Sequence, residues 1–396
     1  MKLKLIALLL AVCMIFSCLT ACGESKQTEE PAAPAETSAP EESAAPTEET
    51  SAGEEAPEMP DWDFAAAYAK HDPDAVVYTV NGAEVVWSEY FAWLYSVIGQ
   101  IATYYGITDW DTELDEGYTC QDYIREYAEG MSCEYALVAR KAADLGISLT
   151  KEDLAAVDAL IQADADAYYD GDVNALFDYL KTSYYTEEYY RFMTGSAMLY
   201  EKIFEHYFGE NGSKLSDEDA LNWVKDNNYI YAKHILIKCI DDEGKPLEDS
   251  ALEEKVELAA DLVKQLQACP DDEREALFDK LMHEYSEDTG LAVNPDGYYF
   301  QTGQMVPNFE YAATTLEKNT VQGVVESEYG LHILYQNGMS ADHVFTCDTY
   351  GNPITVRFQA ANALFSEITA EWTEEMEIVY TPEFETIDLD ELFGVL

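Results

Sequence analysis

The order of elements between residues 229 and 340 constrains the fold of this 396-residue chain more than any other feature. Alternating polar and apolar residues predict strands, and apolar residues that recur every three or four positions predict helices. The pattern gives a strand, two helices, a short strand, a helix and a final pair of strands, at 231–238, 252–266, 277–285, 298–300, 301–310 and 321–335. This order predicts an α+β domain in which helices surround a small antiparallel sheet.

Two histidines, His234 and His332, fall inside strands of this pattern, among isoleucine and leucine residues. A buried histidine needs a hydrogen-bond partner. Two interpretations stay open at this point: the pair belongs to a functional site, or it is a hydrogen-bonded pair that holds the sheet together.

Four motifs in this stretch resemble those of the parvulin, or PpiC-type, peptidyl-prolyl cis/trans isomerases. They are AKHIL, FDKLMHEYSED, GQMVPNFE and VVESEYGLHIL, in the family's order. The resemblance implies a parvulin domain over 229–340 that has isomerase activity and needs no cofactor. Phosphate-specific members carry a basic loop after the first strand, whereas residues 241–249 here are mostly acidic. Recognition of phosphoserine-proline is therefore excluded.

The resemblance also implies which side chains form the site. The catalytic residues of the family fall on His234, Asp288 and His332. Its proline-binding pocket falls on Met305, Phe309, Phe300 and Tyr329. One departure is the turn at Pro295-Asp-Gly-Tyr, where the family has Gly-Asp-Leu-Gly, so the leucine that often lines the pocket is absent.

These residue types suit the isomerisation of a prolyl peptide bond, whose barrier of about 18–20 kcal/mol comes from amide resonance. An apolar slot can hold the proline ring, and polar groups beside it can favour the twisted amide over either planar form.

The N-terminus has the pattern of an export signal. Lys2 and Lys4 precede the apolar run 5–16, and Leu19-Thr-Ala-Cys22 resembles the lipobox of bacterial lipoproteins. The run is shorter than the roughly 20 residues of a membrane-spanning helix. We expect residues 1–21 to be a signal peptide and Cys22 to carry lipid, which would hold the protein on the outer face of the cell membrane.

An acidic segment, residues 22–60, follows the signal. From residue 23 onward it holds six prolines and eleven glutamates against one lysine, and no aromatic residue. Such a segment cannot bury enough apolar surface to offset its ordering entropy, so we expect a disordered tether. The whole chain has 22 Lys+Arg against 78 Asp+Glu, a formal charge of -56. This charge repels phosphate backbones and excludes nucleic acid as a partner.

Residues 61–228 are predicted to be mainly helical, with patterns at 89–105, 120–145, 150–168 and 173–208. They resemble the chaperone-type domain that precedes the parvulin module in PrsA- and SurA-type foldases. A helix at 358–376 would expose an aromatic face if it stood alone. We therefore expect the C-terminal segment 341–396 to pack on the helical domain, so that the parvulin domain is an insertion.

Beyond the signal and Cys22, five cysteines are scattered along the chain, at Cys120, Cys133, Cys239, Cys269 and Cys347. No CxxC motif or Cys/His cluster has the spacing of a metal site, so no metal is expected. The pattern leaves open whether one disulfide forms.

The favoured function is an extracytoplasmic peptidyl-prolyl isomerase and foldase, with unfolded, proline-containing secreted polypeptides as partners. The alternative is a non-catalytic chaperone lipoprotein with a degenerate parvulin domain. A solute-binding lipoprotein would need repeated βαβ patterns, which this chain lacks. Whether two copies form a homodimer is left open.

Overall fold

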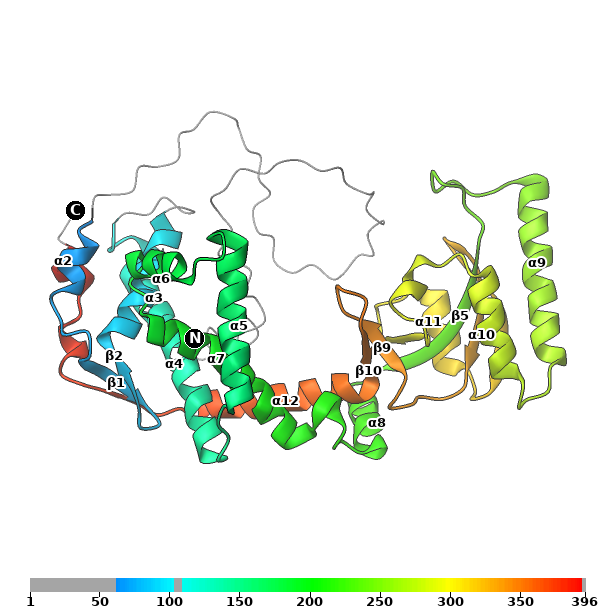
Figure 1. The fold of residues 1–396 in the computed structure, drawn as a ribbon. Coiled ribbons are helices and arrows are strands. Elements are labelled where there is room, and N and C mark those ends of the chain that lie inside the picture. The colour runs from blue at the N-terminus through cyan, green and yellow to red at the C-terminus, as the bar shows by residue number, and fades with distance from the viewer. Residues whose placement is uncertain (1–61, 103–108, 394–396) are drawn as a thin grey trace. The chain divides into compact units, whose positions relative to one another are not determined.

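The computed structural model describes residues 62–102 and 109–393, and these form two compact units (Figure 1). The helical unit holds the described residues up to 206 together with 366–393, and the sheet unit holds 207–365. Two helices, α7 (Glu187–Phe208) and α12 (Val356–Glu374), run from one unit into the other. The predicted signal peptide, Cys22 and the tether lie outside the described residues.

The helical unit combines long helices with a three-stranded sheet of order β11-β1-β2. Besides α7 and the end of α12, its elements are α2 (Phe64–Tyr68), β1 (Val76–Val80), β2 (Ala83–Val86), α3 (Trp87–Gln100), β3 (Glu113–Asp115), β4 (Tyr118–Thr119), α4 (Cys120–Asp144), α5 (Lys151–Tyr168), α6 (Val173–Thr182), β11 (Ile378–Tyr380) and α13 (Leu389–Phe393). Over the part of the chain that the structure describes, no helix has the length and apolar character needed to cross a membrane.

Strands β1 and β2 form a hairpin whose turn residues, Asn81 and Gly82, have φ values of 49° and 82°. Two positive φ values are those of a tight hairpin turn that matches the twist of the strands. The C-terminal strand β11 pairs antiparallel with β1, with Tyr78 opposite Tyr380. The unit therefore joins the first and last described strands of the chain in one sheet.

Local capping explains where the long helices start. Thr119 and Thr150 each form a capping box with the aspartate three residues later, at the starts of α4 and α5. The helical pattern predicted over 173–208 is interrupted, because Tyr184 adopts a positive φ of 64°. The Thr186 hydroxyl then accepts the Tyr189 N–H at the start of α7. One predicted helical stretch is thus two helices, α6 and α7.

The sheet unit is built on a four-stranded antiparallel sheet of order β6-β5-β8-β7. Besides the end of α7 and the first part of α12, its elements are α8 (Asp217–Asp226), β5 (Ile230–Lys238), α9 (Asp249–Ala268), α10 (Arg274–Tyr285), β6 (Tyr298–Phe300), α11 (Pro307–Thr315), β7 (Thr320–Ser327), β8 (Gly330–Gln336), β9 (Val344–Cys347) and β10 (Pro353–Thr355). The α+β fold with small antiparallel sheets is confirmed.

Alternation along β5 and β8 gives the sheet two different faces. Ile235 and Ile333 point to one face, which packs on buried residues of α9 and α10 such as Leu262 and Phe278. Ala232 and Leu334 belong to a separate cluster with Phe300 of β6 and buried residues of α11. Helix α11 therefore covers the face opposite to α9 and α10.

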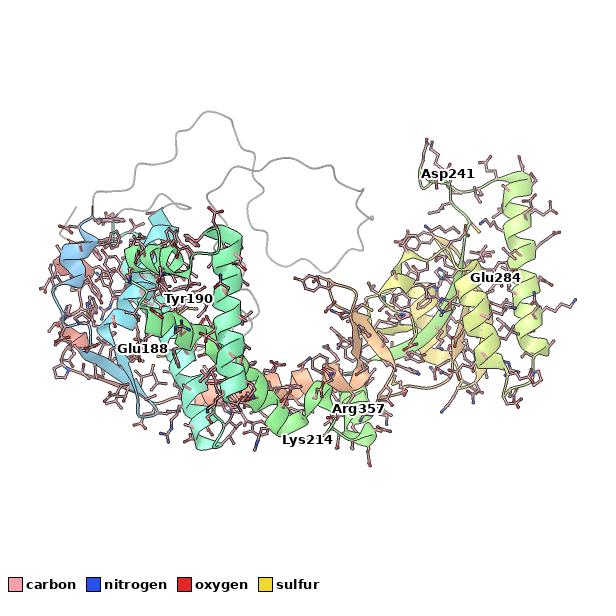
Figure 2. All side chains as sticks on the ribbon, in the orientation of Figure 1. Glu188, Tyr190, Lys214, Asp241, Glu284 and Arg357 are labelled. Carbon is pink, nitrogen blue, oxygen red and sulfur yellow. The ribbon has the colours of Figure 1, made fainter. Side chains whose placement is uncertain are left out.

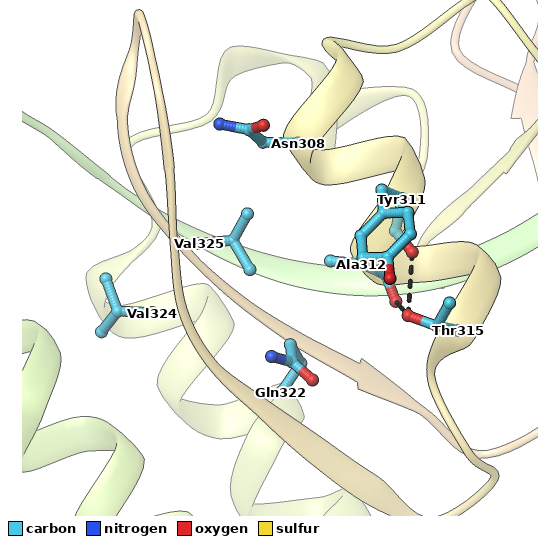
Figure 3. Close-up of a pocket in the computed structure, with 7 residues that line it drawn as sticks. All are labelled: Asn308, Tyr311, Ala312, Thr315, Gln322, Val324 and Val325. Carbon is cyan, nitrogen blue, oxygen red and sulfur yellow. Dashed lines mark hydrogen bonds between the residues drawn. The ribbon is translucent and has the colours of Figure 1, made fainter.

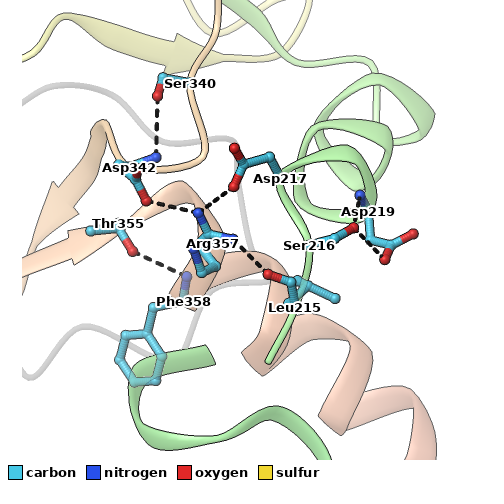
Figure 4. A network of polar contacts seen from close by, with 9 residues as sticks. All are labelled: Leu215, Ser216, Asp217, Asp219, Ser340, Asp342, Thr355, Arg357 and Phe358. Carbon is cyan, nitrogen blue, oxygen red and sulfur yellow. Dashed lines mark hydrogen bonds and ion pairs between the residues drawn. The ribbon is translucent and has the colours of Figure 1, made fainter. Parts of the chain in front are cut away.

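Arg357, near the start of α12, joins segments that flank the sheet in sequence (Figure 4). Its guanidinium donates to the Leu215 carbonyl at 2.5 Å, to Asp217 Oδ1 at 2.5 Å and to Asp342 Oδ1 at 2.8 Å. An apolar cluster that includes Trp223 and Val356 connects the same segments. The two ends of the sheet region are therefore held side by side.

We expect Arg357→Ala to destabilise the protein by about 1–2 kcal/mol, because the substitution removes several charge-assisted hydrogen bonds from a side chain that is only 16% exposed. The matched control is Arg140→Ala, whose ion pair with Asp144 lies on the surface of α4 at 44% exposure and should contribute less than about 0.5 kcal/mol. Chemical denaturation of both variants measures the difference. Equal losses would contradict the role given to Arg357.

Candidate active site

The pairing of β5 with β8 brings His234 and His332 together. Leu236 lies opposite His332, and Leu334 lies opposite His234, so the histidines are diagonal neighbours on the face covered by α11. Their Nδ1 atoms are 3.2 Å apart. Both residues are buried, at 6% and 4% exposure, and each therefore depends on protein partners for its hydrogen bonds.

Hydrogen bonds extend the histidine pair at both ends. His234 Nε2 lies 2.9 Å from Asp288 Oδ2, and His332 Nε2 lies 2.6 Å from the hydroxyl oxygen of Ser327. Ser327 ends β7, directly before the turn into β8. The result is one continuous polar chain, Ser327–His332–His234–Asp288, across the buried face of the sheet.

The Asp288 carboxylate has three donors around it. The residue caps a short 3-10 helix, Thr289–Ala292, and its Oδ1 accepts the Gly290 N–H at 3.0 Å. The Tyr298 hydroxyl donates to Oδ2 at 2.5 Å, beside the bond from His234. Burial raises the pKa of the Asp288 carboxyl, but the hydrogen bonds from His234, Tyr298 and Gly290 outweigh burial and lower that pKa to about 2.

An ionised Asp288 fixes the direction of the polar chain. A carboxylate only accepts hydrogen bonds, so we assign the proton of His234 to Nε2, which leaves its Nδ1 to accept from His332 Nδ1–H. His332 Nε2 then accepts from the Ser327 hydroxyl. Burial, reinforced by His234, lowers the pKa of His332 to about 4, so this ring is neutral at pH 7.

An aromatic wall stands against the polar chain. The ring of Phe309 meets both histidine rings edge-on, with centroids 5.0 Å from His234 and 5.4 Å from His332. Phe300 lies 5.8 Å from Phe309, and both phenylalanines are nearly inaccessible, at 2% and 3% exposure. Met305 is partly buried against the same cluster. Apolar and polar parts of the predicted site therefore share one face of the sheet.

Tyr329 differs from the other predicted pocket residues. Its side chain is half exposed, at 46%, in the turn between β7 and β8. It touches the polar chain through its backbone N–H, which donates to the Ser327 hydroxyl oxygen at 3.2 Å. Tyr329 thus lies at the rim of the predicted site, while the other six predicted residues form one cluster. The catalytic and binding roles of all seven residues stay predictions.

Two further residues in contact with this cluster, Tyr298 and Ser327, were not predicted from the sequence. A signal existed for Tyr298, because it lies two residues before Phe300 on the same strand and so points to the same face. Ser327 falls inside the motif VVESEYGLHIL, but its bond to His332 depends on the turn that brings β7 back alongside β8.

A hollow of about 320 Å³ lies between α11 and β7, lined by side chains that include Asn308, Tyr311, Gln322 and Val324 (Figure 3). None of the predicted site residues lines it. Within residues 62–102 and 109–393, no group of three or more His, Cys, Asp or Glu side chains is arranged to hold a metal ion. The five cysteines in these residues are unpaired.

Comparison of the sequence with known domain families gives a match over this part of the chain. Residues 218–336 match the PPIC-type PPIASE domain, the parvulin class of peptidyl-prolyl isomerase. The chain therefore carries a PPIC-type prolyl isomerase domain.

Curated relatives include two foldases. The chain is 31% identical over 142 residues to the foldase protein PrsA of Oceanobacillus iheyensis, an alignment that covers 35% of this chain and 40% of that protein. It is 33% identical over 128 residues to the foldase protein PrsA of Halalkalibacterium halodurans, with 31% and 32% covered. The chain thus spans less than half the length of these relatives. The crystal structure of PrsA from Bacillus subtilis aligns with 65% of this chain and 86% of that one, at 19% identity and a TM-score of 0.27.

The lowered pKa of His332 predicts that this residue contributes stability that is lost in weak acid. The unfolded chain binds a proton near pH 6.5, whereas folded His332 binds one only near pH 4, so stability is lost as the pH falls through this window. Between pH 7 and pH 5 the contribution of His332 to this loss should be about 2 kcal/mol.

Denaturation at the two pH values, compared between the parent chain and His332→Asn, measures this contribution. The variant should show a smaller loss between pH 7 and pH 5, whatever its absolute stability. His283→Asn, on the exposed end of α10, serves as the control and should keep the full loss. Equal pH dependence in the parent chain and His332→Asn would contradict the assignment.

Proposed function

We propose that this chain is an extracytoplasmic foldase whose sheet unit isomerises prolyl peptide bonds in unfolded secreted polypeptides. The observation that carries the proposal is the buried polar chain from Ser327 to Asp288, set directly against the aromatic wall of Phe300 and Phe309. The PPIC-type domain over 218–336 supports the isomerase step.

The reaction makes and breaks no covalent bond. Rotation about the X-Pro bond removes amide resonance, and with it part of the negative charge on the carbonyl oxygen. A fixed carboxylate beside that oxygen destabilises the planar amide more than the twisted one, and this difference lowers the barrier. We propose that Asp288 supplies this charge, that His234 and His332 hold it in place, and that Met305, Phe309, Phe300 and Tyr329 hold the proline ring.

One observation favours a second candidate function, a chaperone that binds clients without isomerising them. Phe300 and Phe309 are almost completely buried, so a proline ring reaches them only if neighbouring side chains such as Met305 move aside. The two candidates differ in one measurement, which is isomerisation of a proline-containing tetrapeptide in a protease-coupled assay.

Met305→Ala should lower kcat/KM about tenfold in that assay, because the slot loses apolar contacts to the proline ring. The control is Tyr311→Ala on helix α11, which follows Met305 in sequence, since Tyr311 is 74% exposed and lines the separate hollow between α11 and β7. It should keep the parent activity. Circular dichroism checks the fold of both variants. An active parent with an unaffected Met305→Ala variant contradicts the pocket, and an inactive parent favours the chaperone.

The charge of the protein supports clients of basic character. The chain has a formal charge of -56, which attracts cationic unfolded segments and speeds their association. Asp241 lies in the loop between β5 and α9 (Figure 2), where Asp241, Asp242, Glu243 and Glu248 outnumber the single cation, Lys245. An acidic loop repels phosphate. We therefore propose that the protein recognises unfolded segments that contain proline and does not recognise phosphoserine.

The domain organisation proposed from the sequence is a helical chaperone-like part, 61–228, completed by the C-terminal segment 341–396, with the isomerase domain 229–340 inserted between them. Pairing of β11 with β1 supports the return of the C-terminal segment. The contacts of Arg357 support an insertion whose ends lie together. We propose that the helical part binds clients.

Membrane attachment through Cys22 completes the proposal, on the strength of the lipobox-like sequence at 19–22. Cys22→Ser should release the chain from the membrane as a soluble or unprocessed species, because a lipid anchor needs the thiol. Detergent partitioning followed by immunoblotting measures this. A processed Cys22→Ser chain that still partitions into detergent would show that another segment anchors it.

A further inference from the structure

Tyr298 makes the shortest described hydrogen bond to the Asp288 carboxylate. Its hydroxyl donates to Oδ2 at 2.5 Å, compared with 2.9 Å from His234 Nε2 to the same oxygen. The phenol ring meets His234 at a centroid distance of 5.3 Å and packs on the cluster that contains Phe300 and Phe309. Tyr298 is therefore in contact with both the polar chain and the aromatic wall.

The loop after Asp288 leaves room for this hydroxyl. A Cβ added to Gly290 would lie 2.1 Å from the Tyr298 hydroxyl oxygen, which is a severe overlap, and 3.3 Å from the ring carbon Cζ. Gly290 is not among the residues with a positive φ, so its backbone does not itself require glycine. The absence of a side chain at Gly290 therefore leaves the space that the Tyr298 hydroxyl occupies.

We propose that Tyr298 is a positioning residue of the prolyl isomerase site, which holds the Asp288 carboxylate ionised and in one orientation while its ring forms a wall of the proline slot. This inference rests on the proposed function. It assigns to Tyr298 the place left by the leucine that is missing from the turn at 295–298.

The hydrogen bonds around Asp288 show how the positioning works. Oδ2 accepts from Tyr298 and His234 and Oδ1 from the Gly290 N–H, so the carboxylate cannot rotate without losing a bond. The titratable groups that face it are His234 from β5, Tyr298 from β6 and His332 from β8. Burial and the charge of Asp288 raise the pKa of Tyr298, so the phenol stays protonated and remains a donor.

Tyr298→Phe in the full mature chain tests the hydroxyl. Loss of one donor raises the pKa of the Asp288 carboxyl. We expect kcat/KM for a proline tetrapeptide to fall about fivefold through kcat, with KM little changed, because the carboxylate acts on the twisted amide. The acid limb of the pH profile should also move to higher pH.

Tyr299→Phe is the matched control on the same strand. Tyr299 points to the opposite face, where its hydroxyl lies 3.0 Å from His343 Nδ1. We expect it to leave kcat/KM and the pH profile unchanged.

A second readout does not depend on activity. The chain has six histidines, so ¹⁵N-histidine labelling gives few signals. Tyr298→Phe should shift the His234 Nε2 signal at neutral pH, because Asp288 Oδ2, which accepts from His234 Nε2, then loses its second donor. Tyr299→Phe should shift His343 instead and leave His234 unchanged. This double comparison separates a role at Asp288 from a general loss of stability.

Gly290→Ala tests the same contact from the other side, because its added Cβ must displace the phenol while the Gly290 N–H bond to Asp288 is kept. It should lower kcat/KM about as much as Tyr298→Phe does. The double variant should lower kcat/KM by less than the product of the two single reductions, because a phenylalanine at 298 has no hydroxyl to overlap with the added Cβ.

Parent-like activity and an unchanged His234 signal in Tyr298→Phe would overturn the inference and leave the proposed function standing. Independent, multiplicative effects of Gly290→Ala and Tyr298→Phe would also overturn it. A parent chain without isomerase activity would defeat the proposed function, and the response of the His234 signal to Tyr298→Phe and Tyr299→Phe would then decide by itself whether Tyr298 positions Asp288.

Discussion

Antiparallel pairing between β5 and β8 places His234 opposite Leu334 and His332 opposite Leu236. Because side chains alternate across a strand, a shift by one residue would turn His332 toward the apolar face that packs on α9 and α10. The same register points Ile235 and Ile333 into that core. Burial of the isoleucines therefore stabilises the alignment that brings the histidines together, and the site depends on the hydrophobic core behind it.

Burying a polar chain is costly unless every group finds a partner. Here the polar chain runs from Ser327 through both histidines to Asp288. The carboxylate of Asp288 carries its one negative charge and accepts hydrogen bonds from three donors. The neutral His332 and the low pKa of Asp288 follow from the same arrangement. An ordered charge beside an apolar wall is what a catalyst of amide rotation needs, because its substrate changes charge distribution and not covalent structure.

Stabilisation of each unit depends on segments distant in sequence. In the helical unit, β11 adds the last described strand to the first hairpin of the chain. In the sheet unit, Arg357 bridges residues before and after the four-stranded sheet. Such pairings close long loops, and the entropy cost of closing a loop rises only slowly with its length. A chain built in this way tolerates a domain inserted between the elements it brings together.

The sequence by itself determined the order of elements in the sheet unit, its α+β class and the resemblance that places His234, His332 and Asp288 in one site. Periodicity carries this information, because burial repeats every second residue in a strand and nearly every fourth in a helix. Only the tertiary structure decided the direction of the polar chain, the break at Tyr184, and the places of Ser327 and Tyr298. The bond between Tyr298 and Asp288 depends on the loop conformation around Gly290, and no local pattern reports a hydrogen bond set by loop geometry and strand register.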